Sequence, residues 1–230
     1  MSTPTRPRRM HWITELVLIV VVALVVAALV RAFVAQAFYI PSGSMEDTLH
    51  TDDWIVVSKL STTFGSVDRG EVVVFADPAE WLDVEPASPN PVRRALEFVG
   101  VAPDSAEGDL VKRVIGVGGD SVMCCNEDGQ LEVNGTPLNE QEYLFPGDEP
   151  SDAPAGCSGE FDVTVPQGYL WVMGDHRSVS GDSRCQEDLE AFVPDDLVRG
   201  RAVAVVWPFS SWQLLGQPDT SAADAAAAAP

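Results

Sequence analysis

The hydrophobic and polar positions divide the chain into one long apolar segment and a longer region of short apolar runs. Residues 16–30, LVLIVVVALVVAALV, are apolar without interruption and lie between Glu15 and Arg31. At about 1.5 Å per helical residue this run is shorter than the ~30 Å hydrocarbon layer of a bilayer, so flanking residues must contribute. We predict a transmembrane anchor over residues 12–36, in which AFVAQAFYI continues the apolar segment and the Arg31 side chain extends toward water.

From residue 54 onward, short β-branched runs alternate with turn residues. The runs are WIVVSKL, GEVVVFADP, DLVKRVIGVGGD, QLEVNG, FDVTVP, GYLWVMGD and RAVAVVWP. Such spacing is typical of antiparallel strands, and Asn134-Gly135 is typical of a hairpin turn. We therefore predict a mainly β fold, with a single N-terminal transmembrane helix followed by an antiparallel β-sheet domain over residues 37–216.

Two segments depart from this pattern. Residues 78–108 are rich in proline and contain one short helical candidate over residues 92–99, so we predict a small inserted lobe there. The sequence QPDTSAADAAAAAP at residues 217–230 has little means of burying itself, and we predict a disordered tail.

Charge is distributed asymmetrically about the apolar run. Arg6, Arg8 and Arg9 precede it, which predicts a cytoplasmic N-terminus over residues 1–11 and an extracytoplasmic β domain. A cleaved signal peptide is the alternative, because Ala35-Gln36-Ala37 forms an A-x-A-like site. Arg31 lies between the apolar core and that triplet, which favours a retained anchor. The net charge of −21 argues against a nucleic-acid partner bound through bulk charge.

Four cysteines lie in the extracytoplasmic part, where disulfides are favoured over free thiols. Because adjacent cysteines rarely pair with each other, we expect Cys124, Cys125 or both to reach Cys157 or Cys185, with the connectivity open. A zinc site built from all four is disfavoured by the CC spacing and by the lack of a CxxC motif. We predict no metal and no cofactor.

Lysine is scarce in this chain, which has only Lys59 and Lys112. Strand alternation in DLVKRVIGV places Lys112 on one face with Leu110 and Val114. Desolvation by such a face lowers a lysine pKa from its reference of ~10.4, so that the amine can accept a proton. The alternative is that Lys112 reaches solvent or pairs with an acid.

A candidate nucleophile lies in FYIPSGSMEDTL, just after the apolar segment. Pro41 and Gly43 constrain the backbone around Ser42 and Ser44, so that the Ser44 hydroxyl can be presented beside two donors. The Ser44 backbone N–H and the Ser42 hydroxyl would form an oxyanion hole. Linker composition is the alternative interpretation of this stretch.

Four stretches in this order behind an anchor resemble the bacterial type I signal peptidases, which are Ser/Lys dyad serine endopeptidases. They are IPSGSMEDTL, RGEVVVFADP, DLVKRVIGVGGD and MGDHRSVSGDSR. The resemblance implies that Ser44 is the acylating nucleophile, Lys112 the general base, and the Ser44 amide and Ser42 hydroxyl the oxyanion hole. It also implies cleavage of exported preproteins after Ala-x-Ala motifs, with signal peptides and membrane lipid as partners.

Supporting roles follow from the same resemblance. Ser180 is expected to hydrogen-bond the lysine amine and orient it, and Asp182 and Arg184 to form an ion pair that braces the loop. Two positions depart from the family pattern: Asp47 stands where proline is common, and His176 where asparagine is common.

Three other hypotheses stay open on sequence grounds. The chain could be a Ser-His envelope hydrolase with His176 or His50 as base, or a non-catalytic binding protein displayed on an anchor. Self-cleavage after Ala35-Gln36-Ala37 would release the domain, and N-terminal sequencing would then find a start at Phe38.

Overall fold

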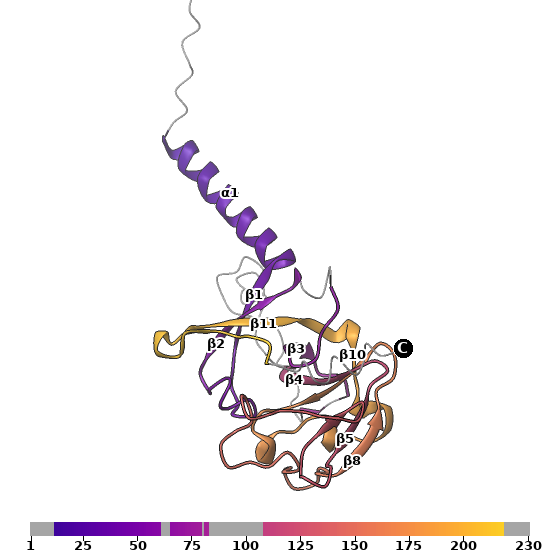
Figure 1. The fold of residues 1–230 in the computed structure, drawn as a ribbon. Helices are drawn as coiled ribbons and strands as arrows, with labels where there is room; N and C mark the ends of the chain where they lie inside the picture. The colour runs from indigo at the N-terminus through magenta and orange to yellow at the C-terminus, as the bar shows by residue number, and fades with distance from the viewer. Residues whose placement is uncertain (1–11, 61–64, 80, 83–107, 219–230) are drawn as a thin grey trace, which may run out of the picture.

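A computed structural model describes residues 12–60, 65–79, 81–82 and 108–218. Helix α1 (Trp12–Phe33) has 22 residues, none of them buried, and projects away from a β domain (Figure 1). Its length is about 33 Å at 1.5 Å per residue, enough to cross a bilayer. The predicted helix over 92–99, most of the predicted lobe, residues 219–230 of the predicted tail and residues 1–11 lie outside the described residues.

The helix ends before the predicted boundary of the anchor. Its last backbone bond joins the Val34 N–H to the Val30 carbonyl, and strand β1 (Ala35–Tyr39) begins one residue later. Of AFVAQAFYI, only Ala32 and Phe33 therefore continue the helix, and the expectation that the whole stretch extends the anchor was wrong. All five β1 residues pair antiparallel with β2 (Trp54–Ser58), a long-range contact that local hydrophobicity does not reveal. Cleavage after Ala37 would require β1 to separate from β2.

The β domain contains two antiparallel sheets. The larger has the order β1-β2-β11-β3-β4-β9-β10, with β12 paired to β11. Its further strands are β3 (Val72–Ala76), β4 (Asp109–Val117), β9 (Tyr169–Met173), β10 (Val193–Pro194), β11 (Val198–Trp207) and β12 (Gln213–Leu214). The smaller has the order β7-β6-β5-β8, formed by β5 (Ser121–Cys124), β6 (Glu132–Val133), β7 (Thr136–Pro137) and β8 (Phe161–Thr164).

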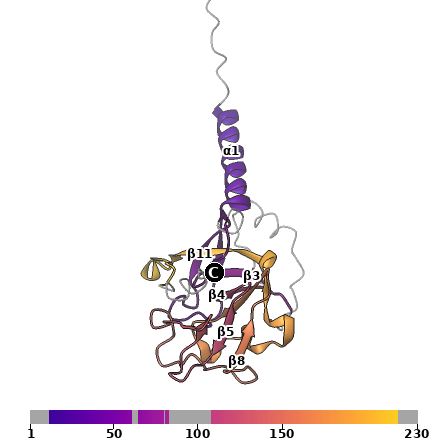
Figure 2. The same ribbon diagram turned by 45° about the vertical axis from the view of Figure 1, so that its right-hand side comes forward.

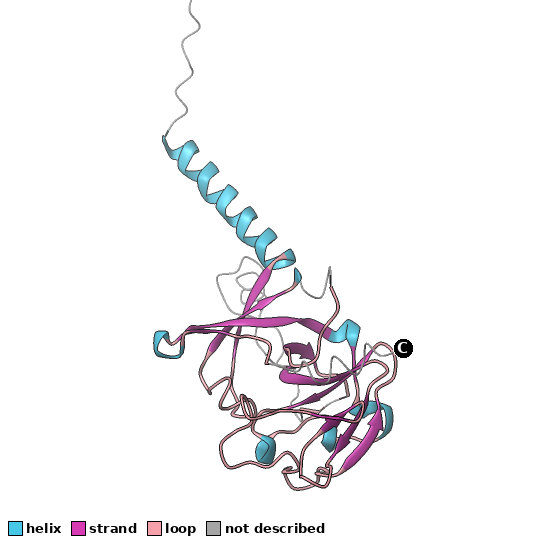
Figure 3. Cartoon of the chain, in the orientation of Figure 1, coloured by secondary structure: helices cyan, strands magenta, loops and turns pink. Residues whose placement is uncertain are grey.

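Short 3₁₀ turns join several strands. They are η1 (Arg177–Val179), η2 (Ser183–Cys185), η3 (Asp188–Ala191), η4 (Asp195–Leu197) and η5 (Phe209–Ser211). Figure 3 shows one long helix and an otherwise strand-rich chain, so the predicted mainly β fold is confirmed for the described residues. The predicted hairpin is also present, because Asn134 and Gly135 both have positive φ between β6 and β7.

A hydrophobic cluster on the larger sheet supports the candidate site. Members come from β1, β2, β3 and β11, and include Phe38, Val57 and Val74. Met45 and Leu49, from the turn after β1, are fully buried in the same cluster. Burying two side chains of this size stabilises that turn by roughly 1.5–3 kcal/mol each. The turn is thereby fixed to the sheet.

A second cluster joins the two sheets. Ile115 and Trp171 from the larger sheet pack with Val122 and Val133 from the smaller one. Figures 1 and 2 both show β5 and β8 on the side of the domain away from α1. The smaller sheet therefore extends the domain away from the anchor.

Both disulfides lie in the domain, but their pairing differs from the prediction. Cys124 pairs with its neighbour Cys125, and Cys157 pairs with Cys185. The expectation that a member of the CC pair reaches Cys157 or Cys185 was wrong. Cys157 lies beside η2, where the Ser158 N–H also donates to the Arg184 carbonyl. The two adjacent cysteines lie together at the end of β5. No thiolate remains among the four for zinc.

Candidate active site

The turn after β1 presents Ser44 toward strand β4. Backbone bonds from Glu46 N–H to the Gly43 carbonyl and from Leu49 N–H to the Met45 carbonyl define the turn. Because Met45 is anchored in the core, the preceding serine is held at the surface of that core rather than on a free linker. The linker interpretation of these serines therefore does not fit the structure.

Lys112 lies in the middle of β4 and meets Ser44. Its Nζ is 2.7 Å from the Ser44 Oγ, and the residue is 3% exposed. Val73 is the residue directly opposite on β3, and Leu110 and Val114 are buried in one cluster with Val73. The alternation of the sequence correctly predicted apolar neighbours for this amine.

Desolvation has the largest effect on the pKa of Lys112. Burial lowers the pKa of Lys112 from 10.5 to about 8, against the raising effects of the Asp182 and Asp175 charges. The positive charge of Arg184 lowers it further. At pH 7 about one molecule in ten therefore carries a neutral amine that can accept the serine proton.

The two nearby carboxylates are each paired with an arginine. Asp182 and Arg184 form an ion pair of 2.8 Å between wholly buried side chains, as predicted. Asp175 accepts two hydrogen bonds from Arg113, of 2.7 and 2.6 Å. Because each carboxylate already has its own counter-charge, neither is left to hold a proton firmly on Lys112.

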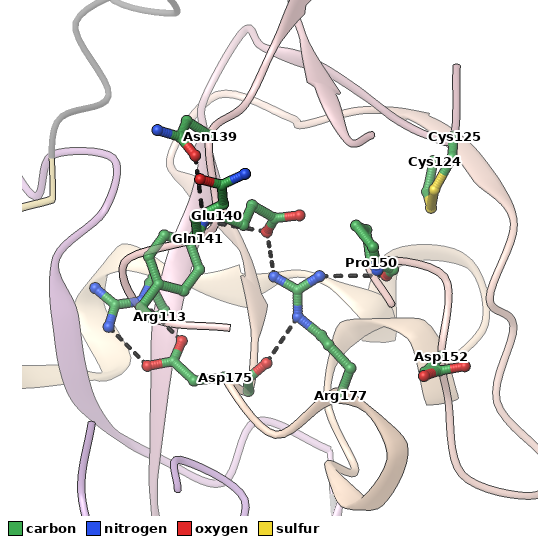
Figure 4. Close-up of polar contacts among 12 residues, drawn as sticks. Arg113, Cys124, Cys125, Asn139, Glu140, Gln141, Pro150, Asp152, Asp175 and Arg177 are labelled. Atoms are coloured by element: carbon green, nitrogen blue, oxygen red, sulfur yellow. Dashed lines mark hydrogen bonds and ion pairs between the residues drawn. A yellow bond between two sulfur atoms is a disulfide. The ribbon is translucent and has the colours of Figure 1, made fainter. Parts of the chain in front are cut away.

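A second buried arginine extends this polar network. Arg177 contacts the Glu140 carboxylate and donates to the Gly174 carbonyl at 2.9 Å. Figure 4 shows its guanidinium group near the Arg113–Asp175 pair. Arg113 and Asp175 were not predicted from the sequence, although charged side chains within DLVKRVIGV and MGDHR were a usable signal.

Gly174 allows the strand end after β9 to approach the nucleophile turn. A Cβ there would lie 2.4 Å from the Ser44 carbonyl oxygen and 2.2 Å from Ser180 Oγ. Such distances are too short for any side chain, so only glycine permits this contact. The Gly174 N–H donates to Asp182 at 3.0 Å, which ties the same strand to the buried ion pair.

Ser42 and Ser44 share a small cavity with Lys112. The cavity has a volume of about 120 Å³, and its other lining includes Phe38, Ile40 and Leu110. Ser42 is exposed and Ser44 half-buried, so a peptide can reach both hydroxyls. An apolar cavity of this size suits a small side chain.

Ser180 lies in the site but does not make the expected bond. It is fully buried, and its Oγ has no hydrogen-bond partner within the part of the chain that the structure describes. An unsatisfied buried hydroxyl is unusual and costs about 1–3 kcal/mol. Its role as the residue that orients Lys112 stays a prediction.

The two described histidines are not placed as bases for Ser44. The exposed His50 ring lies 3.8 Å from Asp53. The His176 Nδ1 lies 3.3 Å from the Gly43 carbonyl oxygen. A Ser-His pairing is therefore not what this structure presents, whereas the Ser44–Lys112 contact is formed.

A serine hydroxyl in contact with a buried, readily deprotonated lysine, on a domain behind an apolar helix, is typical of membrane-anchored serine hydrolases with a lysine base. Comparison with known proteins narrows this class. Residues 13–207 match the family described as "Signal peptidase, peptidase S26". The chain belongs to this family of serine endopeptidases, and the predicted family and enzyme class are confirmed.

Similar proteins come from several bacteria. "Signal peptidase I" of Mycobacterium tuberculosis is 42% identical over 228 residues, covering 90% of this chain and 76% of that protein. "Probable signal peptidase I" of Mycobacterium leprae is 41% identical and covers 92% and 82%. A crystal structure of a signal peptidase I from Enterococcus faecalis has a TM-score of 0.35 and 20% identity, covering 59% of this chain and 96% of that one.

Proposed function

We propose that this protein removes signal peptides from exported preproteins, with Ser44 as nucleophile and Lys112 as general base. The observation that carries the proposal is the 2.7 Å contact between Lys112 Nζ and Ser44 Oγ, made by an amine whose pKa is lowered to about 8. An amine of this kind can take the hydroxyl proton as the serine attacks.

The reaction proceeds through two acyl transfers. Ser44 Oγ attacks the scissile carbonyl while its proton passes to Lys112 Nζ. The resulting ammonium gives that proton to the leaving amine as the C–N bond breaks, which leaves the signal peptide esterified to Ser44. The neutral lysine then takes a proton from water, whose oxygen attacks the ester, and the proton returns to Ser44 Oγ.

The oxyanion formed in each attack needs donors placed beside Ser44. We assign this role to the Ser44 backbone N–H and the Ser42 hydroxyl, which lies in the same cavity. The buried Met45 and Leu49 hold the turn that carries both groups, so the donors are positioned before substrate binds. Asp182 and Arg184 act as supports that keep the loop in place.

Substrate preference follows from the shape of the cavity. Its volume of about 120 Å³ and its largely apolar lining favour small, uncharged side chains such as alanine. This favours cleavage after Ala-x-Ala motifs. The enzyme uses no cofactor in this mechanism, because each proton moves between Ser44, Lys112, water and the leaving amine.

The first test asks whether Ser44 becomes acylated. We expect a lactam that acylates serine to add covalently to the full-length protein, and mass spectrometry to find the added mass on the peptide containing Ser44. The Ser44→Ala protein should take up none. Labelling of Ser44→Ala to the same extent as wild type would refute the nucleophile assignment, and no labelling of either protein would favour a non-catalytic display protein.

We further propose that the N-terminus lies in the cytoplasm and that the domain rests on the outer lipid surface. Arg6, Arg8 and Arg9 support the orientation. Support for lipid contact comes from the end of β11 and the segment after it, where Trp207, Phe209, Trp212 and Leu214 expose 52–77% of their surface. Aromatic side chains of this kind favour the membrane–water interface.

Lipid contact can be measured by fluorescence quenching. In full-length protein carrying Trp12→Phe to remove the anchor signal, we expect bilayers with brominated acyl chains to quench tryptophan emission. Adding Trp207→Ser and Trp212→Ser should remove most of that quenching, because these exposed rings are the ones proposed to enter lipid. Equal quenching with and without these two substitutions would contradict the proposal that this surface enters lipid. Trp171→Phe is the control, because Trp171 is buried and its loss should leave the quenching by lipid unchanged.

A further inference from the structure

His176 contacts the nucleophile turn with both its backbone and its ring. Its backbone N–H donates to the Ser44 carbonyl at 3.1 Å, and its Nδ1 lies 3.3 Å from the Gly43 carbonyl oxygen. The ring stacks on Phe145, with centroids 3.8 Å apart and planes 16° from parallel. With 15% of its side chain exposed, the imidazole is held in one orientation.

The partners of Nδ1 determine which nitrogen carries the hydrogen. A carbonyl oxygen can only accept, so a hydrogen bond across this 3.3 Å contact places the hydrogen on Nδ1. The Glu46 carboxylate lies 3.7 Å from the same nitrogen, too far for a hydrogen bond, so the Gly43 carbonyl is the nearer acceptor. Both the neutral Nδ1–H tautomer and the imidazolium therefore donate to Gly43.

The accepting carbonyl belongs to the peptide group that also contains the Ser44 N–H. This peptide is trans, so the Gly43 C=O and the Ser44 N–H are parts of one rigid plane and point in opposite directions. A donor that holds the carbonyl consequently holds the direction of the N–H. It also polarises the amide, which makes the N–H a stronger donor.

Gly43 has no side chain to fix this plane. Its carbonyl accepts from the Glu46 N–H at 3.1 Å within the turn, and the His176 ring supplies the second contact from another part of the chain. A Cβ on Gly43 would lie 3.1 Å from the Glu46 carboxyl carbon. The orientation of the plane therefore depends on hydrogen bonds rather than on side-chain packing.

We propose that His176 is a positioning residue for the oxyanion hole: its Nδ1–H holds the Gly43 carbonyl and thereby aims the Ser44 N–H at the developing oxyanion. This inference rests on the proposed function, because it assigns a use to the amide of the proposed nucleophile. His176 touches neither substrate nor the reacting atoms, and it acts through the Gly43–Ser44 peptide.

The decisive comparison uses two substitutions in the full-length enzyme. His176→Phe keeps a ring that can stack on Phe145 but removes the Nδ1–H. We expect kcat for preprotein cleavage to fall about tenfold with KM within about twofold, a smaller loss than the 10²–10³ typical of removing an oxyanion donor itself. His176→Asn places an amide nitrogen near the Nδ1 position and should restore kcat to within about threefold of wild type.

A second measurement separates positioning from general damage to the site. An Ala-x-Ala peptide aldehyde forms a tetrahedral adduct with Ser44, and its inhibition constant should rise in His176→Phe by the same factor as kcat/KM falls. His50→Phe, the matched substitution at the exposed histidine, should change none of these values. The thermal midpoints of all variants should stay close to wild type.

Two outcomes would overturn the inference. One is an unchanged kcat in a folded His176→Phe enzyme, and the other is a His176→Asn enzyme as slow as His176→Phe. If Ser44 is still acylated by the lactam in either case, the proposed function stands and only the role of His176 fails. Absence of Ser44 acylation in the wild-type protein would instead remove the proposed function itself.

Discussion

Lys112→Met should reduce preprotein cleavage by about 10³-fold, within the 10²–10⁴ range for loss of a general base. Methionine has a similar length and no basic nitrogen, so the hydroxyl of Ser44 loses the group 2.7 Å away that takes its proton. The loss should appear in kcat, because Lys112 acts on the reacting proton rather than on substrate binding. Steady-state kinetics with a preprotein substrate in detergent or bilayers measures it.

The unfolding temperature of the variant provides a control for this prediction. Lys112 is buried, so replacing its amine with an apolar side chain removes a desolvation cost, and Lys112→Met should unfold at the same temperature as wild type or higher. Lys59→Met, at the only other lysine in the chain, should retain near-parental cleavage. Near-parental cleavage by a folded Lys112→Met enzyme would refute the assignment of the base.

The pH dependence of cleavage should have its acidic limb near pH 8. Lys112 must be neutral to accept a proton, and its pKa is lowered to about 8 because burial disfavours the charged form. Below that pKa the neutral fraction falls tenfold per pH unit, so kcat/KM at pH 6 should be roughly 1% of its plateau. Above pH 8 the rate should level off as the amine becomes fully neutral.

The position of this limb distinguishes the two kinds of base. An imidazole would place it near ~6.5, about 1.5 units lower. The measured quantity should be kcat/KM, which reports the free enzyme rather than the substrate complex. A limb near 6.5 that disappears in His176→Phe would transfer the base role to that histidine, whereas a limb near 8 that persists in that variant supports the lysine.

Carboxylate pairing explains why the lysine pKa can be lowered in so acidic a protein. Asp175 and Asp182 both raise the pKa of Lys112, yet the net shift is downward. Each carboxylate is held by its own buried arginine, Arg113 or Arg184. The net charge of −21 is thus compatible with a deprotonated base, because the carboxylates nearest to it are already neutralised.

Local patterns in the sequence predicted much of the fold and of the site. An uninterrupted apolar run predicted the helix, and β-branched runs predicted strands such as β3, β4 and β9. The alternation around Lys112 correctly predicted that its neighbours on the same strand face are apolar, since residues two apart on a strand share a face. The pairing of Ser44 with Lys112 came from resemblance to a family, because 68 residues separate the two.

The amino-acid sequence by itself determined the anchor, the strand series and the chemical types available for catalysis, because each depends on neighbours within a few residues. Only the tertiary structure decided where α1 ends, which cysteines pair and which partners Asp175 and His176 have. These features depend on contacts between distant segments: β1 leaves the helix to pair with β2, and the segment after β9 meets the turn that carries Ser44. The hydrophobic periodicity of a strand predicts the face on which a residue lies. The residue that it contacts in the core depends on which strands pair and in which register.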